Sequence, residues 1–588
     1  MKSADSEIIK YSNWSLIKDL YFYVKPQRGR FILASLLRLT GDIVNLYPAI
    51  ALASIVTFFS EYSAGSSLRD FWFFFALWAL ASFWRNIAVH GAKYLAFQVS
   101  EKSSLNAQLR AIKRLFSLDM AWHEKENAGN KLKKIQRGGM GIDHILRMWI
   151  NNCIEIAVNF IGIIVILSRN DKFVSSAILF FLVSYFTISF FSLRKVSAIV
   201  QEVNAREEEM SGLVFQAINN VRSVKVAGIG GKLYEMIAGQ AEEVFAWTKK
   251  RILNFQVRGT ALNVWAATFR LGTLAFIAYG IYQGRSELGF FILFNSYFQR
   301  ILESVGELSD VTQDLIVNKH SIARLQSIIN EPVRIENEEG KADFPQNWKK
   351  ISIKNLSFAY GKNPVLKNIS LEIKRGERIG IVGLSGAGKS TLFKLLLKEN
   401  ESFAGDITVD GLSLKKIKKD SYLDRVGVVL QETEVFNFTL RENITIACNR
   451  DLDENELSRT LDIAHVSDFV SKLPLGINTF IGEKGVKLSG GEKQRLGIAR
   501  CIYKQPDLLF LDEATSHLDL ESEEKIKDSL HSFFKKVTAI VIAHRLTTIQ
   551  EMDRILVIEK GELIESGSFL ELCDRRGRFY ELWEKQKL

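Results

Sequence analysis

The chain has 588 residues, too many for one ordinary domain, so at least two domains are expected. Hydrophobic residues make up 47% of it, Phe occurs 40 times and Pro only 7 times, which favours long helices in lipid over a wholly soluble protein. The net charge of +11 fits either nucleic-acid binding or basic cytoplasmic loops, and the four scattered cysteines exclude a CxxC metal site and a disulfide framework.

Residues 1–30 form a polar, charged N-terminal segment without a cleavable signal peptide, so the first membrane segment is expected to direct insertion. Within it, residues 14–25 predict a short amphipathic helix with Trp14, Ile17 and Tyr21 on one side. We interpret this helix either as an elbow that lies in the membrane interface or as an ordinary surface helix.

Six apolar stretches follow, each long enough to cross a bilayer, which needs roughly 20 residues. Lys and Arg gather before the first stretch and in residues 98–143, whereas the short connections carry few. The positive-inside rule therefore places both termini in the cytoplasm, and we expect a multi-pass protein of a bacterial plasma (inner) membrane, in contact with lipid. The stretches predict an all-α transmembrane domain over 31–329, with helices near 31–59, 71–97, 144–168, 172–194, 260–283 and 287–308.

Two segments between these stretches, 98–143 and 195–259, are too long and too periodic to be loops. They predict long cytoplasmic helical extensions of the membrane helices. Each segment has a break, at residues 122–129 and 219–231.

The predicted spans also contain charged and amide residues, which are costly in a membrane and usually face a cavity or one another. We interpret them either as a polar translocation path or as internal ion pairs and interhelical hydrogen bonds. As a group they favour an amphipathic or charged cargo. The residues are Arg38, Asp42, Asn45, Arg85, Asn86, His90, Arg147, Asn151, Asn152, Glu155, Asn159, Arg270, Asn295, Gln299, Arg300 and Glu303.

The character of the chain changes after residue 329. Residues 330–348 are acidic and polar and predict a linker. Beyond it, over 349–588, short β-type runs alternate with helical stretches, which predicts an α/β domain with a largely parallel sheet. The runs lie near 351–359, 378–382, 426–430, 507–511, 538–542 and 555–558.

The run from Gly383 to Ser390 matches GxxxxGK[ST] between a predicted strand and a predicted helix, the context that a phosphate-binding loop requires. Its backbone amides and the helix N-terminus would form a cradle for phosphates. Lys389 is expected to reach the β- and γ-phosphates, and the Ser390 hydroxyl to coordinate Mg²⁺. The predicted nucleotide-binding residues of this loop are Gly383, Ser385, Gly386, Ala387, Gly388, Lys389, Ser390 and Thr391.

A second pattern is the apolar run 508–511, which ends in Asp512 and Glu513. In phosphate-loop ATPases an aspartate at such a strand end holds Mg²⁺, and Asp512 fits this role. Glu513 is placed to polarise the attacking water as general base.

Leu488-Ser489-Gly490-Gly491-Glu492 resembles the signature of ATP-binding cassette (ABC) proteins, and the resemblance extends over the whole chain. It implies an exporter half-transporter similar to lipid and multidrug exporters: a six-helix transmembrane domain fused to a phosphate-loop ATPase of ABC type. In this family the breaks near 122–129 and 219–225 would be coupling helices that dock on the ATPase domain. ATP and Mg²⁺ are the implied cofactors.

The resemblance also assigns roles to single residues. Tyr360 would stack on adenine, Gln431 would sense Mg²⁺, and His544 would contact the γ-phosphate. Glu513 and His544 would be the catalytic residues, and Ser390, Gln431 and Asp512 the Mg²⁺ ligands. Ser489, Gly490, Gly491 and Glu492 would complete the ATP site of a second copy. Residues 516–519 resemble the loop that crosses the dimer interface, although His517 stands where a small residue or Asn is usual, and Glu492 stands where Gln is more common.

The leading hypothesis is an ATP-hydrolysing exporter that works as a homodimer and moves a hydrophobic or amphipathic substrate by alternating access. Lipid, lipid-linked sugar, drug and peptide all remain open as cargo. The alternatives are an ATP-gated channel or membrane regulator, one half of a heterodimer, and a soluble ATPase of the same superfamily, against which the apolar stretches argue. No nucleic-acid partner is expected, because the basic residues 415–419 fit a solvated surface.

Overall fold

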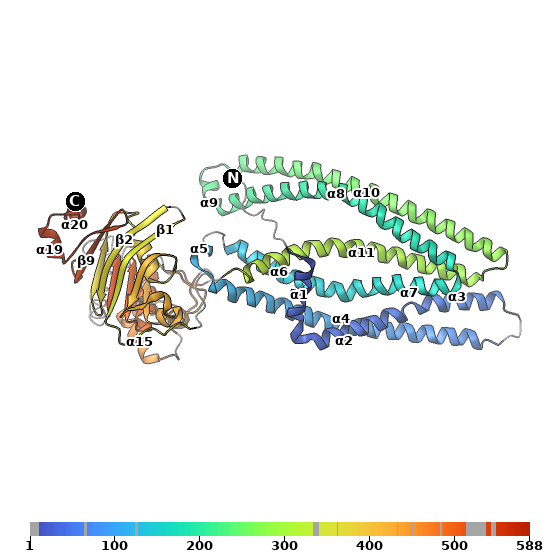
Figure 1. The fold of residues 1–588 in the computed structure, drawn as a ribbon, viewed down its shortest axis with the longest axis horizontal. Helices are drawn as coiled ribbons and strands as arrows, with labels where there is room; N and C mark the ends of the chain where they lie inside the picture. The colour runs from blue at the N-terminus through green and yellow to red at the C-terminus, as the bar shows by residue number, and fades with distance from the viewer. Residues whose placement is uncertain are drawn as a thin grey trace. The chain divides into compact units, whose positions relative to one another are not determined.

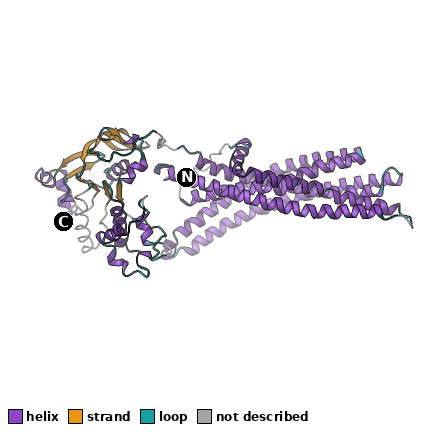
Figure 2. Cartoon of the chain, turned by 90° about the horizontal axis from the view of Figure 1, so that it is seen from below, coloured by secondary structure: helices purple, strands orange, loops and turns teal. Residues whose placement is uncertain are grey.

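The computed structural model describes residues 11–63, 67–123, 128–332, 340–361, 363–431, 433–448, 451–482, 485–512, 537–542 and 549–587. The chain divides into two compact units. The membrane unit comprises Met1–Phe116 and Ala128–Glu331, and the cassette unit comprises Ser117–Asn127 and Pro332–Leu588. All strands of the described residues belong to the cassette unit, and the membrane unit is helical (Figure 2). The predicted fold class is confirmed.

The helices of the membrane unit are long and follow one another with short connections (Figure 1). Helices α4, α8 and α10 have 49, 48 and 53 residues, more than a bilayer needs. They extend beyond the apolar stretches, as the sequence predicts. The elements are α1 (Asn13–Val24), η1 (Lys25–Gln27), α2 (Arg28–Val44), α3 (Tyr47–Ser60), α4 (Arg69–Ser117), α6 (Ala128–Met148), η2 (Trp149–Cys153), α7 (Ile154–Asn170), α8 (Lys172–Asn219), α9 (Val221–Val226), α10 (Gly230–Tyr282) and α11 (Leu288–Ile329).

Five helical stretches of the described residues are long and apolar enough to cross a membrane, by length and composition: Asn13–Ser60, Arg69–Ser117, Ala128–Asn170, Lys172–Ser192 and Gly230–Tyr282. The sixth predicted span, 287–308, lies in α11, which is not among them. Asn295, Gln299 and Arg300 reduce the apolar character of that helix. The count of six membrane helices stays a prediction.

Two predicted spans are interrupted. The span near 31–59 consists of two helices, because α2 ends at Val44 and α3 begins at Tyr47 with Pro48 in its first turn, where a missing N–H costs nothing. The span near 144–168 contains the π-helical turn η2 between α6 and α7. Of the two predicted breaks, the second (219–231) contains the short helix α9. The first (122–129) overlaps the end of α5 (Met120–His123) and the start of α6, and its residues 124–127 lie outside the described part.

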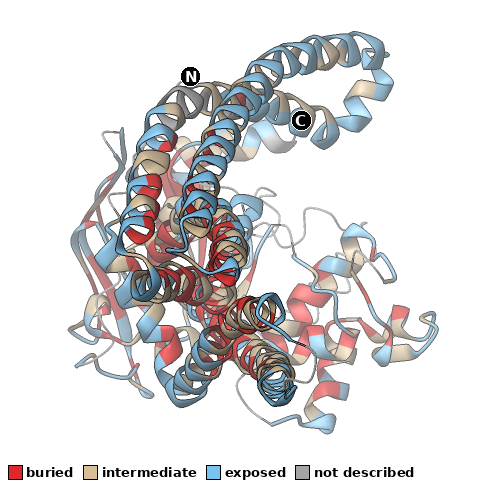
Figure 3. Ribbon diagram, turned by 90° about the vertical axis from the view of Figure 1, so that its right-hand side faces the viewer, coloured by how far each residue is buried: buried red, intermediate tan, exposed pale blue. Residues whose placement is uncertain are grey.

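Small residues hold the membrane helices together. Helix α4 buries Ala81, Ala88, Ala92 and Ala96 at the spacing of one helical face. The packing is tight, since a Cβ on Gly41 of α2 would lie 3.2 Å from the Cβ of Ala88. The opposite side of α4 exposes large aromatic side chains such as Trp72 and Phe83, and much of α8 and α10 is exposed as well (Figure 3). These exposed apolar faces are suited to contact with lipid.

The cassette unit contains two sheets. The larger has the order β10-β9-β3-β8-β7-β6 and is parallel except for β10; the smaller has the order β2-β1-β4-β5 and is antiparallel. The strands are β1 (Lys350–Tyr360), β2 (Asn363–Lys374), β3 (Arg378–Val382), β4 (Ala404–Val409), β5 (Leu412–Ser413), β6 (Val426–Val429), β7 (Leu508–Asp512), β8 (Thr538–Ile542), β9 (Arg554–Glu559) and β10 (Glu562–Gly567).

Helices and short turns surround the sheets, and apolar clusters fill the space on both faces of the larger sheet. The helical elements are α12 (Lys389–Leu396), η3 (Leu414–Lys416), α13 (Lys419–Asp424), α14 (Leu440–Thr445), α15 (Glu454–Ile463), α16 (Ser467–Val470), η4 (Gly476–Asn478), α17 (Gly490–Lys504), α19 (Phe569–Asp574) and α20 (Arg578–Lys587). Packing of this unit starts before β1, because Phe344 and Trp348 of the predicted linker are buried in one of these clusters. Linker residues 333–339 lie outside the described part.

Candidate functional site

Four neighbouring strands of the larger sheet, β3, β8, β7 and β6, run parallel, so their carboxyl ends meet at one edge. Residues 383–390 follow β3, Asp512 ends β7, and Gln431 comes shortly after β6. Asp512 lies opposite Ile542, the last residue of β8. The predicted catalytic residues come shortly after these strand ends, Glu513 one residue after Asp512 and His544 two residues after Ile542. Both lie outside the described residues, as does the loop 516–519.

The phosphate-loop sequence folds into a turn that only glycine permits at Gly388. This residue has a φ of +106°, and a Cβ there would lie 2.8 Å from the Cδ2 atom of Leu366 on β2. Gly388 caps helix α12 at its N-terminus. The Nζ atom of Lys389 donates hydrogen bonds to the carbonyls of Gly383 at 2.8 Å and Leu384 at 3.1 Å. The lysine cation is thus held over the loop, next to the exposed Ser385, Gly386 and Ser390.

Backbone hydrogen bonds hold the phosphate loop 383–390 in place. The amide of Gly561, in the turn between β9 and β10, donates to the carbonyl of Ala387, and the amide of Lys367 on β2 donates to the carbonyl of Gly561. The loop is therefore held by both sheets, with Thr391 in the first turn of α12. Tyr360 ends β1 with its ring exposed and in edge contact with Phe358.

The signature residues form the start of helix α17. Ser489 is the N-cap, and its hydroxyl accepts from the amide of Glu492 at 3.4 Å. The Oε2 atom of Glu492 in turn lies 2.8 Å from both the amide and the hydroxyl of Ser489, so the carboxylate accepts from this residue. The reciprocal pair is a capping box. Together with Gly490 and Gly491 it presents an exposed helix N-terminus that carries the Glu492 carboxylate in its first turn.

Helix α17 is tied to the segment that follows Gln431. Arg500 donates to the carbonyl of Asn443 at 2.7 Å, to the Oδ1 atom of the same residue at 2.7 Å and to the carbonyl of Glu434 at 2.6 Å. A Cβ on Gly497 would lie 2.6 Å from the Oγ1 atom of Thr433. Burial lowers the pKa of Arg500 from its usual value, because the charged form loses water. The signature helix and the exposed Gln431 therefore share one rigid support.

Replacement of Arg500 by leucine is expected to destabilise this support. The variant leaves the Asn443 and Glu434 carbonyls without their donor, which corresponds to a loss of about 2–4 kcal/mol in the free energy of unfolding. Thermal unfolding of the purified chain measures the effect, with Lys493→Leu, on the exposed side of α17, as control. Equal unfolding midpoints for the two variants would contradict the role of Arg500.

Glu492→Gln is expected to lower the ATP concentration at which hydrolysis is half-maximal. The glutamine still accepts from Ser489 through its carbonyl oxygen, but it removes a negative charge from the helix N-terminus that would face phosphate. The half-saturating ATP concentration for hydrolysis should fall about two- to fivefold at low salt, since a charge at a helix end contributes about 0.3–1 kcal/mol. ATPase titrations at low and high salt test this; an unchanged or raised half-saturating concentration contradicts it.

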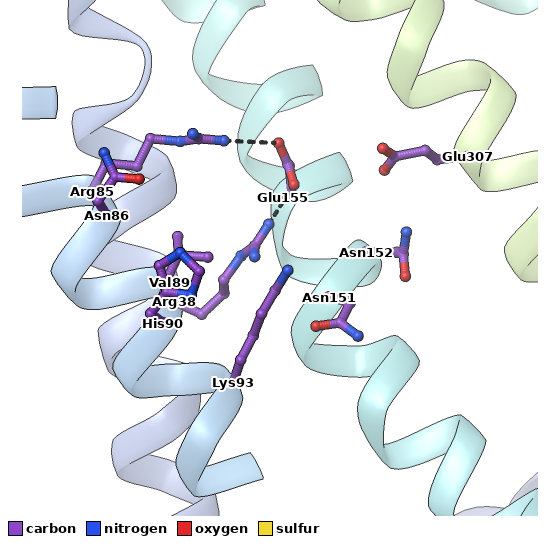
Figure 4. Close-up of a pocket in the computed structure, with 10 residues that line it drawn as sticks. All are labelled: Arg38, Arg85, Asn86, Val89, His90, Lys93, Asn151, Asn152, Glu155 and Glu307. Atoms are coloured by element: carbon purple, nitrogen blue, oxygen red, sulfur yellow. Dashed lines mark hydrogen bonds and ion pairs between the residues drawn. The ribbon is translucent and has the colours of Figure 1, made fainter. Parts of the chain in front are cut away.

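The membrane unit contains a polar cavity of about 520 Å³, lined by ten residues from α2, α4, η2, α7 and α11 (Figure 4). Arg38 is almost fully buried; its Nε atom donates to Asp42 at 2.7 Å, and its guanidinium also contacts Glu155. The Oε1 atom of Glu155 lies 4.0 Å from the Nη2 atom of Arg85. Lys93 also lines the cavity.

Other polar residues of the predicted spans form internal pairs. Arg147 binds Asp143 at 2.7 Å, Arg270 donates to the Oδ1 atom of Asn295 at 2.6 Å, and Asn159 donates to the Oγ atom of Ser304 at 2.9 Å. Internal pairing thus accounts for one subset of the polar residues, and a second subset lines the cavity: Arg38, Arg85, Asn86, His90, Asn151, Asn152 and Glu155. The role of the cavity as a translocation path stays a prediction.

Lys93 and Glu307 line the cavity but were missed by sequence reasoning. A signal was present, because Lys93 lies three residues after His90 and Glu307 lies four residues after Glu303. Each is therefore on the same helical face as a residue that the sequence did single out. Both lie within the last five residues of a predicted span, 71–97 and 287–308, where a charge is common and gives a weak signal.

The chain was compared with known proteins. A family model described as ABC transporter transmembrane region matches residues 31–305, and one described as ABC transporter matches residues 366–516. The ATP-dependent lipid A-core flippase of Syntrophus aciditrophicus is 33% identical over 72% of this chain and 70% of its own length. Heavy metal tolerance factor 1 of Caenorhabditis elegans is 30% identical over 87% of this chain and 66% of its own length.

Among solved structures, the chain is similar to a bacterial Atm1-family ABC exporter with ATP bound. The identity is 26%, the TM-score is 0.85, and the match covers 95% of this chain and 98% of the other. The match to the transmembrane region thus precedes the match to the ABC transporter model within one chain. The chain therefore belongs to the ABC transporter family, as a multi-pass exporter half-transporter that binds ATP and couples its hydrolysis to transport.

Proposed function

We propose that two copies of this chain form a homodimer in which each ATP is bound by the phosphate loop of one copy and the signature helix of the other. The sheet order carries this proposal. Helix α17 packs beside β6, whereas the loop 383–390 follows β3, three strands away. At about 4.8 Å per strand the two strands lie roughly 14 Å apart, which places the start of α17 to one side of the loop, where the exposed Ser489 would face the nucleotide of a second copy.

We further propose that Mg²⁺ accompanies the nucleotide. The Ser390 hydroxyl, the Gln431 amide oxygen and the Asp512 carboxylate would hold it, and oxygen donors of this kind suit a hard divalent cation. When bound, the ion neutralises charge on the β- and γ-phosphates. Lys389 would hold the same phosphates, Glu513 would take the proton from the attacking water, and His544 would contact the γ-phosphate. Tyr360 would stack on the adenine ring.

Hydrolysis would separate the two cassette units, since the γ-phosphate that both copies grip is lost. Helices α5 and α9 would transmit this change to the membrane helices, which switch between inward-facing and outward-facing forms. The cargo would be amphipathic: the polar cavity of Figure 4 receives its head while apolar helix faces remain open to lipid. Cytoplasmic termini in a bacterial inner membrane fit the basic N-terminal segment and a bacterial relative.

Uptake into inside-out vesicles tests this function. A fluorescent amphipathic cargo should accumulate above its external concentration only with hydrolysable ATP and Mg²⁺, and vesicles with the Lys389→Ala chain are the control. A channel or a regulator of the same superfamily would at most equalise the two concentrations. Equilibration without accumulation would therefore contradict active export.

A further inference from the structure

The polar cavity of the membrane unit contains a set of charges that neutralise one another. Arg38 contacts both Asp42 and Glu155, and Glu155 also faces Arg85 at 4.0 Å. These contacts connect α2, α7 and α4 (Figure 4). These ion pairs have a structural role, because a buried charge is tolerated only with a partner.

Two charged groups of the same cavity stand outside this set. Lys93 on α4 makes no ion pair with any described residue. On α11, the Oε2 atom of Glu307 is buried and receives no hydrogen bond from any of them. The Nε atom of Arg85 and the Oδ1 atom of Asn151 are in the same state. The cavity thus offers unused donors on α4 and unused acceptors on α11 and η2.

This combination restricts the ligand. A group that is only anionic would satisfy Lys93 and Arg85 but leave Glu307 unpaired, and a group that is only cationic would do the reverse. The buried, unsatisfied atoms of Glu307, Arg85 and Asn151 are costly, and the half-buried Lys93 adds an unpaired cation, so the best ligand supplies both signs. Building on the export function proposed above, we propose that this cavity binds a zwitterionic group of the cargo, its anionic end at Lys93 and Arg85 and its N–H-bearing ammonium at Glu307 and Asn151.

The geometry of the cavity suits such a group. Its volume of about 520 Å³ lies within the range of small-molecule sites. Asn151 and Asn152 of the π-helical turn η2 both line the cavity, and such turns frequently occur at functional sites. In Figure 4, Asn152 lies beside Glu307.

The depth of the cavity indicates two possible sources of the zwitterion. Glu307 is roughly 28 Å along α11 from Leu288, close to the hydrocarbon thickness of about 30 Å. This level corresponds to lipid headgroups, so an ethanolamine phospholipid can supply the group. A free zwitterion from the adjoining water, such as a short peptide, carries the same chemistry.

The test uses the full chain in phosphatidylcholine nanodiscs, because the quaternary ammonium of that lipid has no N–H donor. One arm adds phosphatidylethanolamine or its N-acetylated form; the other adds dialanine or N-acetyl-dialanine. In the arm that contains the true source, the free-amine probe should stimulate ATP hydrolysis with a half-saturating concentration about tenfold below that of its acetylated counterpart.

Two variants test which residue binds each end of the zwitterion. Glu307→Gln should raise the half-saturating concentration of the free-amine probe about tenfold and leave that of the acetylated probe unchanged, whereas Lys93→Gln should raise both. Glu307→Asp, which keeps the charge, should preserve the preference for the free amine. Glu287→Gln and Lys172→Gln, at exposed positions outside the cavity, should change neither probe.

Equal responses to free and acetylated probes, an equal effect of Glu307→Gln on both, or no response in either arm would overturn the proposal. Failure of the export function is a separate result: it would appear as absent ATP-driven accumulation in the vesicle experiment. ATP-driven export that persists while no probe responds would reject the zwitterion and retain the exporter.

Discussion

Glu513→Gln should reduce ATP turnover by roughly 10²–10⁴-fold while ATP binding is retained. Asp512 ends β7 at the sheet edge where the loop 383–390 also lies, and Glu513 is the next residue in the sequence. The glutamine is nearly isosteric but cannot accept the proton of the attacking water. With ATP bound and not hydrolysed, both copies keep their grip on the γ-phosphate and the closed dimer accumulates.

Single-turnover hydrolysis and size-exclusion chromatography with ATP measure the two effects. Glu584→Gln is the matched control, because Glu584 is exposed on α20, close to the end of the cassette unit. Turnover near the wild-type rate in Glu513→Gln would remove Glu513 from its role as general base.

Lys389→Ala should weaken ATP binding by about 10- to 100-fold and abolish measurable hydrolysis. The ammonium of Lys389 is held over the phosphate loop by the carbonyls of Gly383 and Leu384, and no other cation of the loop replaces it. Its charge-assisted hydrogen bonds to the phosphates are lost in the alanine variant.

Equilibrium binding of a fluorescent ATP analogue measures the loss. Lys394→Ala, five residues further along α12, removes a cation of the same helix outside the loop and should bind nearly as the wild type does. The thermal unfolding midpoint of each variant separates lost binding from lost folding. Unchanged affinity in Lys389→Ala would contradict the assignment of the phosphate loop.

The sequence predicted the cassette unit well where local patterns decide the structure. The apolar runs that became β3, β6, β7, β8 and β9 are buried on both faces, and such runs between turn residues are characteristic of parallel strands. Strands β2, β4 and β10 were not identified, because exposed polar residues interrupt their apolar residues, and β5 has only two residues. The capping box of Ser489 and Glu492 was readable from the spacing S-x-x-E but was not recognised.

The membrane cavity was harder to predict because it depends on residues distant in sequence. Arg38 and Glu155 are separated by 117 positions, and their pairing follows from the packing of α2 against α7. Periodicity places a residue on a helical face, but it does not say which helix that face meets. The polar residues of the spans can therefore be identified from the sequence, but the packing of the helices decides which of them pair and which line the cavity.

The central claim is that each nucleotide lies between two copies, and mixing two inactive chains tests it most directly. A dimer of Lys389→Ala chains and a dimer of Ser489→Arg chains should each be inactive. When equal amounts are co-assembled, the mixed dimer combines the intact phosphate loop of one copy with the intact Ser489 of the other, so ATP hydrolysis should return. Hydrolysis that stays absent in verified mixed dimers, or that proceeds in the Ser489→Arg chain alone, would contradict the shared site.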